Sequence, residues 1–560
     1  MYPDSGCFLR YTAGLIGCYI TLSHRWTRFS KACRTTAANY EERIAGQDLE
    51  NRLSGHFQNA FELARGLGVQ YVWIDSICII QETQDVRREM ANMGQYYQLS
   101  YFTIAAVNSS EEVDEGFLAM RGADPIKSMV HMPYLEKGVQ KGSLCIYRRE
   151  LTADAQFLRD VDRSELLTRG WVFQEWLLAR RILYFGACET FFECAKQGVA
   201  SLSFDKLSRR DVVSLASMDD KFWFHGGESA FVDAYQNNTL VTYGFKSDGE
   251  HKWADWPLDE WFLVTQKYST TSVTVPDDRF FAISAVAGEF LTLVKRKYGS
   301  EQRADLPTYL SGIWQQDICR GLMWISRHPA SSVKECNGLA PTWSWMSLDS
   351  PVAWIGRVWH ARNRQDKDPQ DFRPQKAIEI VGVGTGSAHT SVEDSLPNSN
   401  VSEVLTPVIR LTIRAKLQYL VTSGRMSDMT RMGQLTGFRY VIHYGRPNDF
   451  FCVSSLDNPR GSGGWGKFER IEPLAPPYCA LESATPLIAL LIATREWAGI
   501  DYEDHTSLFR HGALDTYEVL FVQPVNLRDD IYKRVGAGIV FDRHIQKAFD
   551  QTLPTEITLI

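Results

Sequence analysis

The stretch Tyr71–Ile80, YVWIDSICII, decides the fold class of this 560-residue chain. Its apolar residues fall on both alternating faces, as in a central strand of a parallel sheet that helices cover on each side. Strand patterns and helix patterns alternate around it. The strand patterns are Cys18–Ser23, Tyr101–Val107 and Arg181–Phe185, and the helix patterns are Leu53–Leu67, Val86–Tyr97 and Trp171–Ala179. The alternation predicts an α/β domain on a parallel sheet, which we place at residues 1–204.

The remainder of the chain divides into two regions with different patterns. Apolar residues recur at helical spacing in residues 205–340, which predicts a mainly helical region. Its expected helices are Trp256–Lys267, Asp278–Lys297 and Tyr309–Ile325. Short apolar runs predict a β-rich C-terminal region at residues 341–560. Its expected strands are Ile378–Val383, Val408–Leu420, Phe438–His443, Tyr517–Val522 and Ile557–Ile560.

Composition excludes several classes of protein. A formal net charge of −7, from 60 basic and 67 acidic residues, provides no basic footprint for nucleic acid. The 11 cysteines are odd in number and irregularly spaced, which indicates reduced thiols and a cytoplasmic location. The apolar run Thr12–Leu22 is similar to a short signal-peptide region, but Asp4 precedes it and no A-x-A site follows, which favours a buried first strand. The run Leu487–Ala493 is far shorter than the roughly 20 residues that cross a bilayer. We therefore expect no membrane span.

Two motif-like segments are not expected to bind a ligand. The segment Gly461–Lys467, GSGGWGK, has the glycine and lysine spacing of a phosphate loop, but Phe468 stands where such a loop needs Ser or Thr. Cys188 and Cys194 flank the strand-like run ETFFE, and the sequence contains neither H-E-x-x-H nor a pair of C-x-x-C motifs. We predict no metal site.

Polar side chains follow the first predicted strand, at the edge where α/β sheets bind ligands. The tetrapeptide Ser23–Trp26, SHRW, offers a hydroxyl, an imidazole, a guanidinium and a ring that can stack. The candidate ligand-binding residues here are Ser23, Arg25 and Trp26. The alternative is a loop whose polar groups cap a helix and whose Trp26 ring packs into the core.

Asp75 is a carboxylate inside an apolar run, so it needs a cation or several hydrogen-bond donors. The candidate partners are Arg25 and Arg169. A structural ion pair and a contact with a ligand explain Asp75 equally well.

The segment Arg169–Tyr184, RGWVFQEWLLARRILY, carries the second group of candidates. Trp171 and Glu175 are four residues apart, so on a helix they share one face. The ring could stack a planar base while the carboxylate contacts a ribose or stabilises a developing positive charge. Alternatively, Glu175 lies near the positive end of a helix dipole and pairs with Arg169 or Arg180.

Four sequence blocks, in this order, resemble the heterokaryon-incompatibility (HET) domain family of filamentous fungi. They are YITLSHRW (Tyr19–Trp26), YVWIDSICIIQ (Tyr71–Gln81), the helix with Asp85, Glu89 and Met93 that leads to TIAA, and RGWVFQEWLLARRILYFG (Arg169–Gly186). The segments LPTYLSGIWQQDICRGLMWI and APTWSWMS resemble the region that usually follows such domains. One departure is Val86, which replaces the usual Trp.

The resemblance implies a cytoplasmic protein of non-self recognition whose HET domain triggers programmed cell death. The domain would act as a signalling module, by self-association or with a partner incompatibility protein. The family is also distantly similar to TIR domains, whose sheet is flavodoxin-like, and some TIR domains cleave NAD. By this analogy Glu175 is the catalytic residue and contacts the nicotinamide ribose, Trp26 or Trp171 stacks a base, and Arg25 or Arg169 faces the pyrophosphate. NAD would then be a substrate, and no cofactor is implied.

Overall fold

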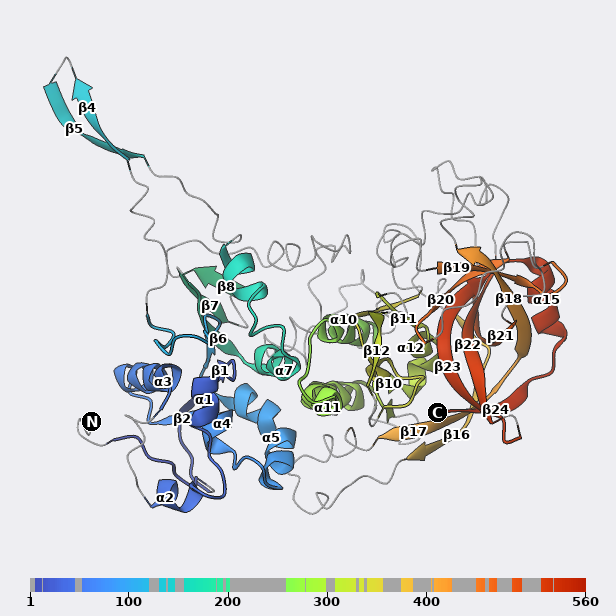
Figure 1. Cartoon of the computed structure of the whole chain (residues 1–560), viewed down its shortest axis with the longest axis horizontal. Helices are drawn as coiled ribbons and strands as arrows, with labels where there is room; N and C mark the ends of the chain where they lie inside the picture. The colour runs from blue at the N-terminus through green and yellow to red at the C-terminus, as the bar shows by residue number, and fades with distance from the viewer. Residues whose placement is uncertain are drawn as a thin grey trace. The chain divides into compact units, whose positions relative to one another are not determined.

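The computed structural model places two compact units, residues 1–243 and residues 244–560 (Figure 1). The structure describes residues 6–12, 14–45, 53–119, 130–136, 139–146, 156–187, 189–194, 198–201, 258–276, 278–298, 308–328, 332–336, 340–355, 374–385, 404, 407–425, 450–458, 463–470, 486–495, 515–526 and 528–560. Our division of the chain at residues 204 and 340 stays a prediction. Among the described residues, no helix is both long enough and apolar enough to span a bilayer.

A mixed sheet organises the first unit, which confirms the predicted α/β domain. Within the described residues its strand order is β2-β1-β3-β6-β7-β8. The parallel strands are β2 (Tyr71–Ile74), β1 (Tyr19–His24), β3 (Thr103–Ala106) and β6 (Arg181–Phe185), and the antiparallel ones are β7 (Thr190–Cys194) and β8 (Gly198–Ser201). The next strand after β1, β2, pairs with one edge of β1, and the strand after that, β3, pairs with its other edge. The carboxyl ends of β1 and β3 therefore mark the switch point at which such sheets bind ligands.

Alternate residues of the strands send apolar side chains to the two faces of this sheet. Ile104 packs in one cluster with α3 (Gly55–Gly66), while its neighbour Ala105 packs in another with Val172 of α7 (Gly170–Leu178). A third cluster joins α5 (Asp85–Leu99) to α7. The helices α1 (Arg28–Ala32) and α2 (Tyr40–Ile44) follow β1. Helices thus cover both faces of the sheet, as the strand pattern predicts.

The predicted single strand Tyr71–Ile80 is wrong in its length and its place. The strand β2 ends at Ile74, and Asp75 begins the short helix α4 (Asp75–Cys78). The Asp75 carboxylate accepts a hydrogen bond from the backbone N–H of Ser76 at 2.6 Å, in the first turn of this helix. Within the described sheet β2 pairs with β1 alone, so it is an edge strand rather than a central one.

In the second unit the helices α10 (Leu258–Ser269) and α11 (Asp278–Tyr298) confirm two predictions, but the helix expected at Tyr309–Ile325 is wrong. That segment forms β9 (Tyr309–Leu310), β10 (Ile313–Trp314), η5 (Gln315–Asp317), α12 (Ile318–Leu322) and β11 (Trp324–Ser326). The turn between β9 and β10 has positive φ at Ser311 (43°) and Gly312 (100°), as a tight hairpin requires. The carbonyl oxygen of Gly312 accepts hydrogen bonds from the indoles of Trp261 and Trp345, both at 2.9 Å.

The C-terminal part of the second unit is a closed antiparallel barrel, which confirms the β-rich prediction. Within the described residues the ring runs β18-β19-β20-β23-β22-β21 and returns to β18. These strands are β18 (Leu417–Arg425), β19 (Phe450–Ser455), β20 (Gly464–Phe468), β21 (Pro486–Arg495), β22 (Thr516–Asn526) and β23 (Ile531–Val540). The helix α15 (Arg543–Gln551) adds Ile545 and Phe549 to the barrel's apolar core.

Three more strands extend the barrel sheet beyond β23. They are β24 (Thr555–Leu559), β17 (Val408–Ala415) and β16 (Glu379–Thr385). The segment Val408–Leu420, predicted as one strand, is therefore parts of two strands, β17 and β18. The predicted strand Phe438–His443 lies outside the described residues.

The glycines of the rejected phosphate-loop motif serve the packing of the barrel. Gly466 of β20 lies opposite Gly538 of β23, and a Cβ added at either would lie within 3 Å of the Phe521 ring, at 2.5 Å and 2.9 Å. The two glycines therefore make room for a fully buried aromatic side chain. Gly464, two residues before Gly466, is also confined, because its added Cβ would lie 2.3 Å from the backbone oxygen of Ile539. Close packing thus accounts for the G-x-G spacing.

Gly538→Ala is expected to destabilise the barrel by about 1–3 kcal/mol. The added Cβ would lie 2.1 Å from the backbone oxygen of Trp465, an atom that cannot rotate aside. Gly382→Ala in β16 is the matched control, because nothing lies within 4 Å of its added Cβ. Urea unfolding of the full chain measures both variants. Equal midpoints for the two would contradict the packing role of Gly538.

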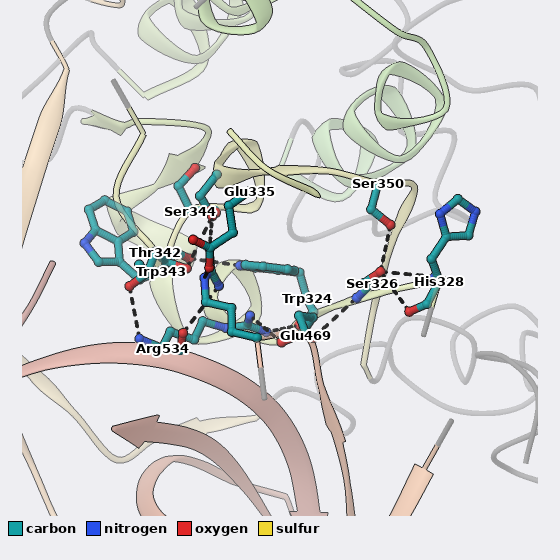
Figure 2. Close-up of polar contacts among 12 residues, drawn as sticks. Trp324, Ser326, His328, Glu335, Thr342, Trp343, Ser344, Ser350, Glu469 and Arg534 are labelled. Carbon is teal, nitrogen blue, oxygen red and sulfur yellow. Dashed lines mark hydrogen bonds and ion pairs between the residues drawn. The ribbon is translucent and has the colours of Figure 1, made fainter. Parts of the chain in front are cut away.

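A buried ion pair joins the barrel to the strand β11, which begins at Trp324 (Figure 2). Arg534 of β23 and Glu469 are both fully buried, with Nη1 and Oε2 2.9 Å apart. The Arg534 guanidinium also donates to the backbone oxygen of Trp324 and lies 3.5 Å from the centre of its ring. Glu469 in turn accepts from the backbone N–H of Ser326 at 3.4 Å. The pair thus fixes β11 against the outside of the sheet.

Candidate functional site

Polar side chains from four elements meet at the carboxyl edge of the first unit's sheet. They are His24 at the end of β1, Asp75 at the start of α4, Tyr97 in α5 and Glu175 in α7, and Ser23 precedes His24. Electrostatic interactions link Glu175 to Asp75 and Tyr97, and link His24 to Asp75. We call these five residues the edge cluster. The sequence predicted three of its members, Ser23, Asp75 and Glu175.

The Asp75 carboxylate is held by hydrogen-bond donors rather than by a predicted arginine. One oxygen accepts from the indole N–H of Trp26 at 2.7 Å, and the other accepts from the backbone N–H of Ser76 at 2.6 Å. The Nδ1 atom of His24 lies 3.7 Å from the second oxygen. The side chain of Asp75 remains 17% exposed, so these contacts position it without enclosing it fully.

Glu175 is a buried carboxyl group, with only 4% of the residue exposed. Burial raises its pKa to about 7, and the negative charge of Asp75 adds to this increase. The Ser23 hydroxyl, the charge of Arg169 and the nearby Tyr97 hydroxyl act in the opposite direction. Glu175 therefore changes its protonation state near neutral pH, as acid–base residues of enzymes do.

His24 is a buried imidazole that the sequence placed in the SHRW loop but not among the candidate site residues. Burial lowers its pKa, and the neighbouring Asp75 partly offsets this effect. Its ring lies edge-on to Phe57 at 5.0 Å, and neither ring nitrogen hydrogen-bonds to a described residue. Arg169 donates to the backbone oxygen of His24 at 3.0 Å, which ties the start of α7 to the end of β1.

Tyr97 is the second edge-cluster residue missing from the predicted site. It is fully buried and donates to the backbone oxygen of Leu22 at 3.3 Å. The only signal in the sequence was its place on the apolar face of the predicted helix Val86–Tyr97. That signal indicates burial and gives no reason to expect a hydroxyl beside Glu175.

Two predicted site residues have other contacts. Arg25 pairs with Glu165, and its Nη2 lies 3.7 Å from Glu111, in a partly exposed ion-pair network. Trp171 packs against the apolar cluster that contains Met93 and Tyr97. Their roles toward a ligand stay predictions.

The sequence profile of the heterokaryon incompatibility protein (HET) family matches residues 19–175. The chain carries a HET domain. The matched span begins at the first residue of β1 and ends at Glu175, so it includes every residue of the edge cluster. It also contains β2, β3 and most of α7. No curated protein and no solved structure matches this chain.

The edge cluster of the HET domain combines two carboxyl groups in different environments. Asp75 has fixed donors and access to solvent, whereas Glu175 is enclosed and titrates near neutrality. Two carboxyl groups with such different surroundings can take different roles in acid–base chemistry. Within the described part of the chain, no group of three or more His, Cys, Asp or Glu side chains could hold a metal ion.

Proposed function

We propose that this chain acts in heterokaryon incompatibility as a cytoplasmic protein whose HET domain triggers programmed cell death. The match of residues 19–175 to the HET family carries this proposal. Inducible expression of the full chain in a filamentous fungus tests it by counting viable cells. We expect loss of viability on induction, and normal growth at a verified protein level would contradict the proposal.

The HET domain is proposed to signal by self-association or by binding a partner incompatibility protein. A switch of this kind requires no chemical step, in keeping with a sequence that lacks an established catalytic motif. Light scattering of the purified full chain over a range of concentrations measures the self-association. A strict monomer at every concentration would contradict self-association and leave binding of a partner protein as the proposed signal.

A second candidate function is cleavage of the N-glycosidic bond of a nucleotide, with NAD as the first substrate to test. The position of Glu175 supports it, because this enclosed carboxyl group lies beside Asp75 at the ligand-binding edge of the sheet. The parallel strand order β2-β1-β3-β6 also follows the flavodoxin-like order 2-1-3-4, which supports the likeness to TIR domains.

Release of nicotinamide from NAD by the full chain tests this second function. Glu175→Gln is expected to abolish the release. Glu193→Gln is the matched control, since Glu193 of β7 is also a buried carboxyl group and accepts from the Tyr184 hydroxyl at 2.5 Å. Equal turnover by the wild type and Glu175→Gln would remove Glu175 from the reaction.

A further inference from the structure

We propose that the edge cluster divides the cleavage of an N-glycoside between its two carboxyl groups: Glu175 protonates the leaving base, and Asp75 stabilises the positive charge on the sugar. The proposal rests on the second function above and names its substrate class. That class is nucleotides whose base is neutral before cleavage, such as purine nucleotides. It reverses the role that the likeness to TIR domains implies for Glu175.

Asp75 has the geometry of the carboxylate that stabilises positive charge on the sugar. The two donors at 2.7 Å and 2.6 Å come from Trp26 and from the backbone of Ser76, and both favour negative charge on the acceptor. They also fix the direction of the carboxylate before a substrate arrives, which is the condition for stabilising a transition-state charge. The Asp75 side chain is 17% exposed, unlike the enclosed Glu175.

Glu175 has the geometry of the carboxyl group that keeps a proton. It is nearly excluded from solvent, and Asp75 opposes a second negative charge beside it. Two nearby carboxyl groups with such different surroundings take the acid role and the charge-stabilising role in glycoside hydrolysis. The enclosed member donates the proton.

The remaining polar groups around Glu175 leave this assignment intact. His24, from β1, is held neutral by burial and so adds no positive charge. The Arg169 guanidinium at the start of α7 donates to the His24 backbone oxygen and favours the charged form of Glu175, but burial and the charge of Asp75 have the larger, opposite effect. Tyr97, from α5, lies beside Glu175, and the pKa of its hydroxyl is raised well above its ordinary value, so Tyr97 stays neutral. Among the described residues that act on Glu175, Asp75 from α4 is the one that brings a negative charge.

The chemical step balances without any other reagent than water. The bond between the sugar C1′ and the base nitrogen breaks, and its electron pair goes to the base. The Glu175 proton moves to the base, which leaves neutral, while the cationic sugar faces the Asp75 carboxylate. Water then adds at C1′ and gives its proton to the Glu175 carboxylate, which restores the starting state.

The role of Glu175 as a proton donor determines which substrates benefit from it. A purine is a poor leaving group as an anion, so it needs a proton as the bond breaks. A pyridinium base such as that of NAD already carries a positive charge and leaves neutral without a proton. A proton on Glu175 therefore accelerates purine release and gives no help with nicotinamide.

The test compares adenine release from AMP with nicotinamide release from NAD, using the full chain between pH 5 and pH 9. We expect kcat/KM for AMP to fall tenfold per pH unit above about pH 7, where Glu175 loses its proton. Glu175→Gln should lower that value by about 10²–10⁴-fold and remove the fall at high pH. Asp75→Asn should lower it at every pH, and Glu193→Gln should leave it unchanged.

The outcomes separate this inference from the function on which it rests. Nicotinamide release that rises with pH and is lost in Glu175→Gln, with no adenine release, overturns the inference and keeps NAD cleavage. Adenine release with the same pH profile in the wild type and Glu175→Gln also overturns it. Release of neither base overturns both. The wild-type pH profile decides the role of Glu175 even where Asp75→Asn does not fold.

Discussion

Arg534→Met is expected to lower the free energy of unfolding of the second unit by about 3–5 kcal/mol. The variant leaves the Glu469 carboxylate fully buried without its 2.9 Å partner. Burial already raises the pKa of Glu469, and the charge of Arg534 is the main effect that lowers it. The variant also loses the contact of the guanidinium with the Trp324 ring. Pulse proteolysis of the full chain in urea, followed through peptides of residues 515–560, measures the change.

An exposed ion pair in the same unit provides the matched control. Arg414 and Glu379 are 2.6 Å apart but 45% and 66% exposed, so Arg414→Met should cost no more than about 1 kcal/mol. The double variant Arg534→Met with Glu469→Leu removes both buried charges and should recover much of the loss. A cost for Arg534→Met as small as that for Arg414→Met would show that the buried pair does not hold β11 to the barrel.

The parallel sheet could be predicted because alternate residues of a strand point to opposite faces, so apolar residues at successive positions indicate burial on both faces. Ile104 and Ala105 pack on opposite faces, as the alternation in the predicted strand Tyr101–Val107 requires. The same reasoning failed at Tyr71–Ile80, because an apolar run does not distinguish a strand from a strand followed by one helical turn. The strand β2 ends at Ile74 and the single helical turn α4 follows it, and four residues are too few to show a helical apolar period.

The predicted helix at Tyr309–Ile325 failed for a related reason. Its apolar residues have helical spacing, but two positive φ angles at Ser311 and Gly312 turn the chain back on itself. The indoles of Trp261 and Trp345 stabilise this turn through the Gly312 oxygen. Both indoles lie more than 30 residues away in the sequence, so the competing tertiary contacts could not be seen locally.

The candidate site was predictable in its place and less so in its contacts. Leu22 and Ile74 are paired in the parallel strands β1 and β2, so the backbone alone places the next residues, Ser23 and Asp75, close together at one edge of the sheet. The partner of Asp75 depends on which side chain of the SHRW loop turns inward, and the structure selects Trp26 over Arg25. Arginine is the stronger electrostatic partner, but Glu165 engages it at the surface.

Glu175→Gln is expected to remove a loss of stability that the HET domain undergoes as the pH rises. In the unfolded chain this carboxyl group ionises at its ordinary pKa of 4.5, and in the folded domain it does so at about 7. Between these values the folded state binds more protons than the unfolded state, so the free energy of unfolding falls with rising pH. The full loss is about 3 kcal/mol, complete above pH 7. Glutamine has no proton to lose, so the variant keeps this stability at pH 8.

The titration of His24 gives an internal reference for this experiment, because it makes the free energy of unfolding depend on pH at the acid end. Burial lowers its pKa in the folded domain, so below its ordinary value of 6.5 the unfolded state binds the extra proton and stability falls with falling pH. That loss should be the same in the wild type and in Glu175→Gln. Pulse proteolysis at several pH values, followed through peptides of residues 156–187, measures both sides. Glu62→Gln, an exposed change on α3, is the control. If wild type and Glu175→Gln lose stability equally between pH 5 and pH 8, Glu175 is ionised throughout, and it cannot be the group that holds a proton at the sheet edge.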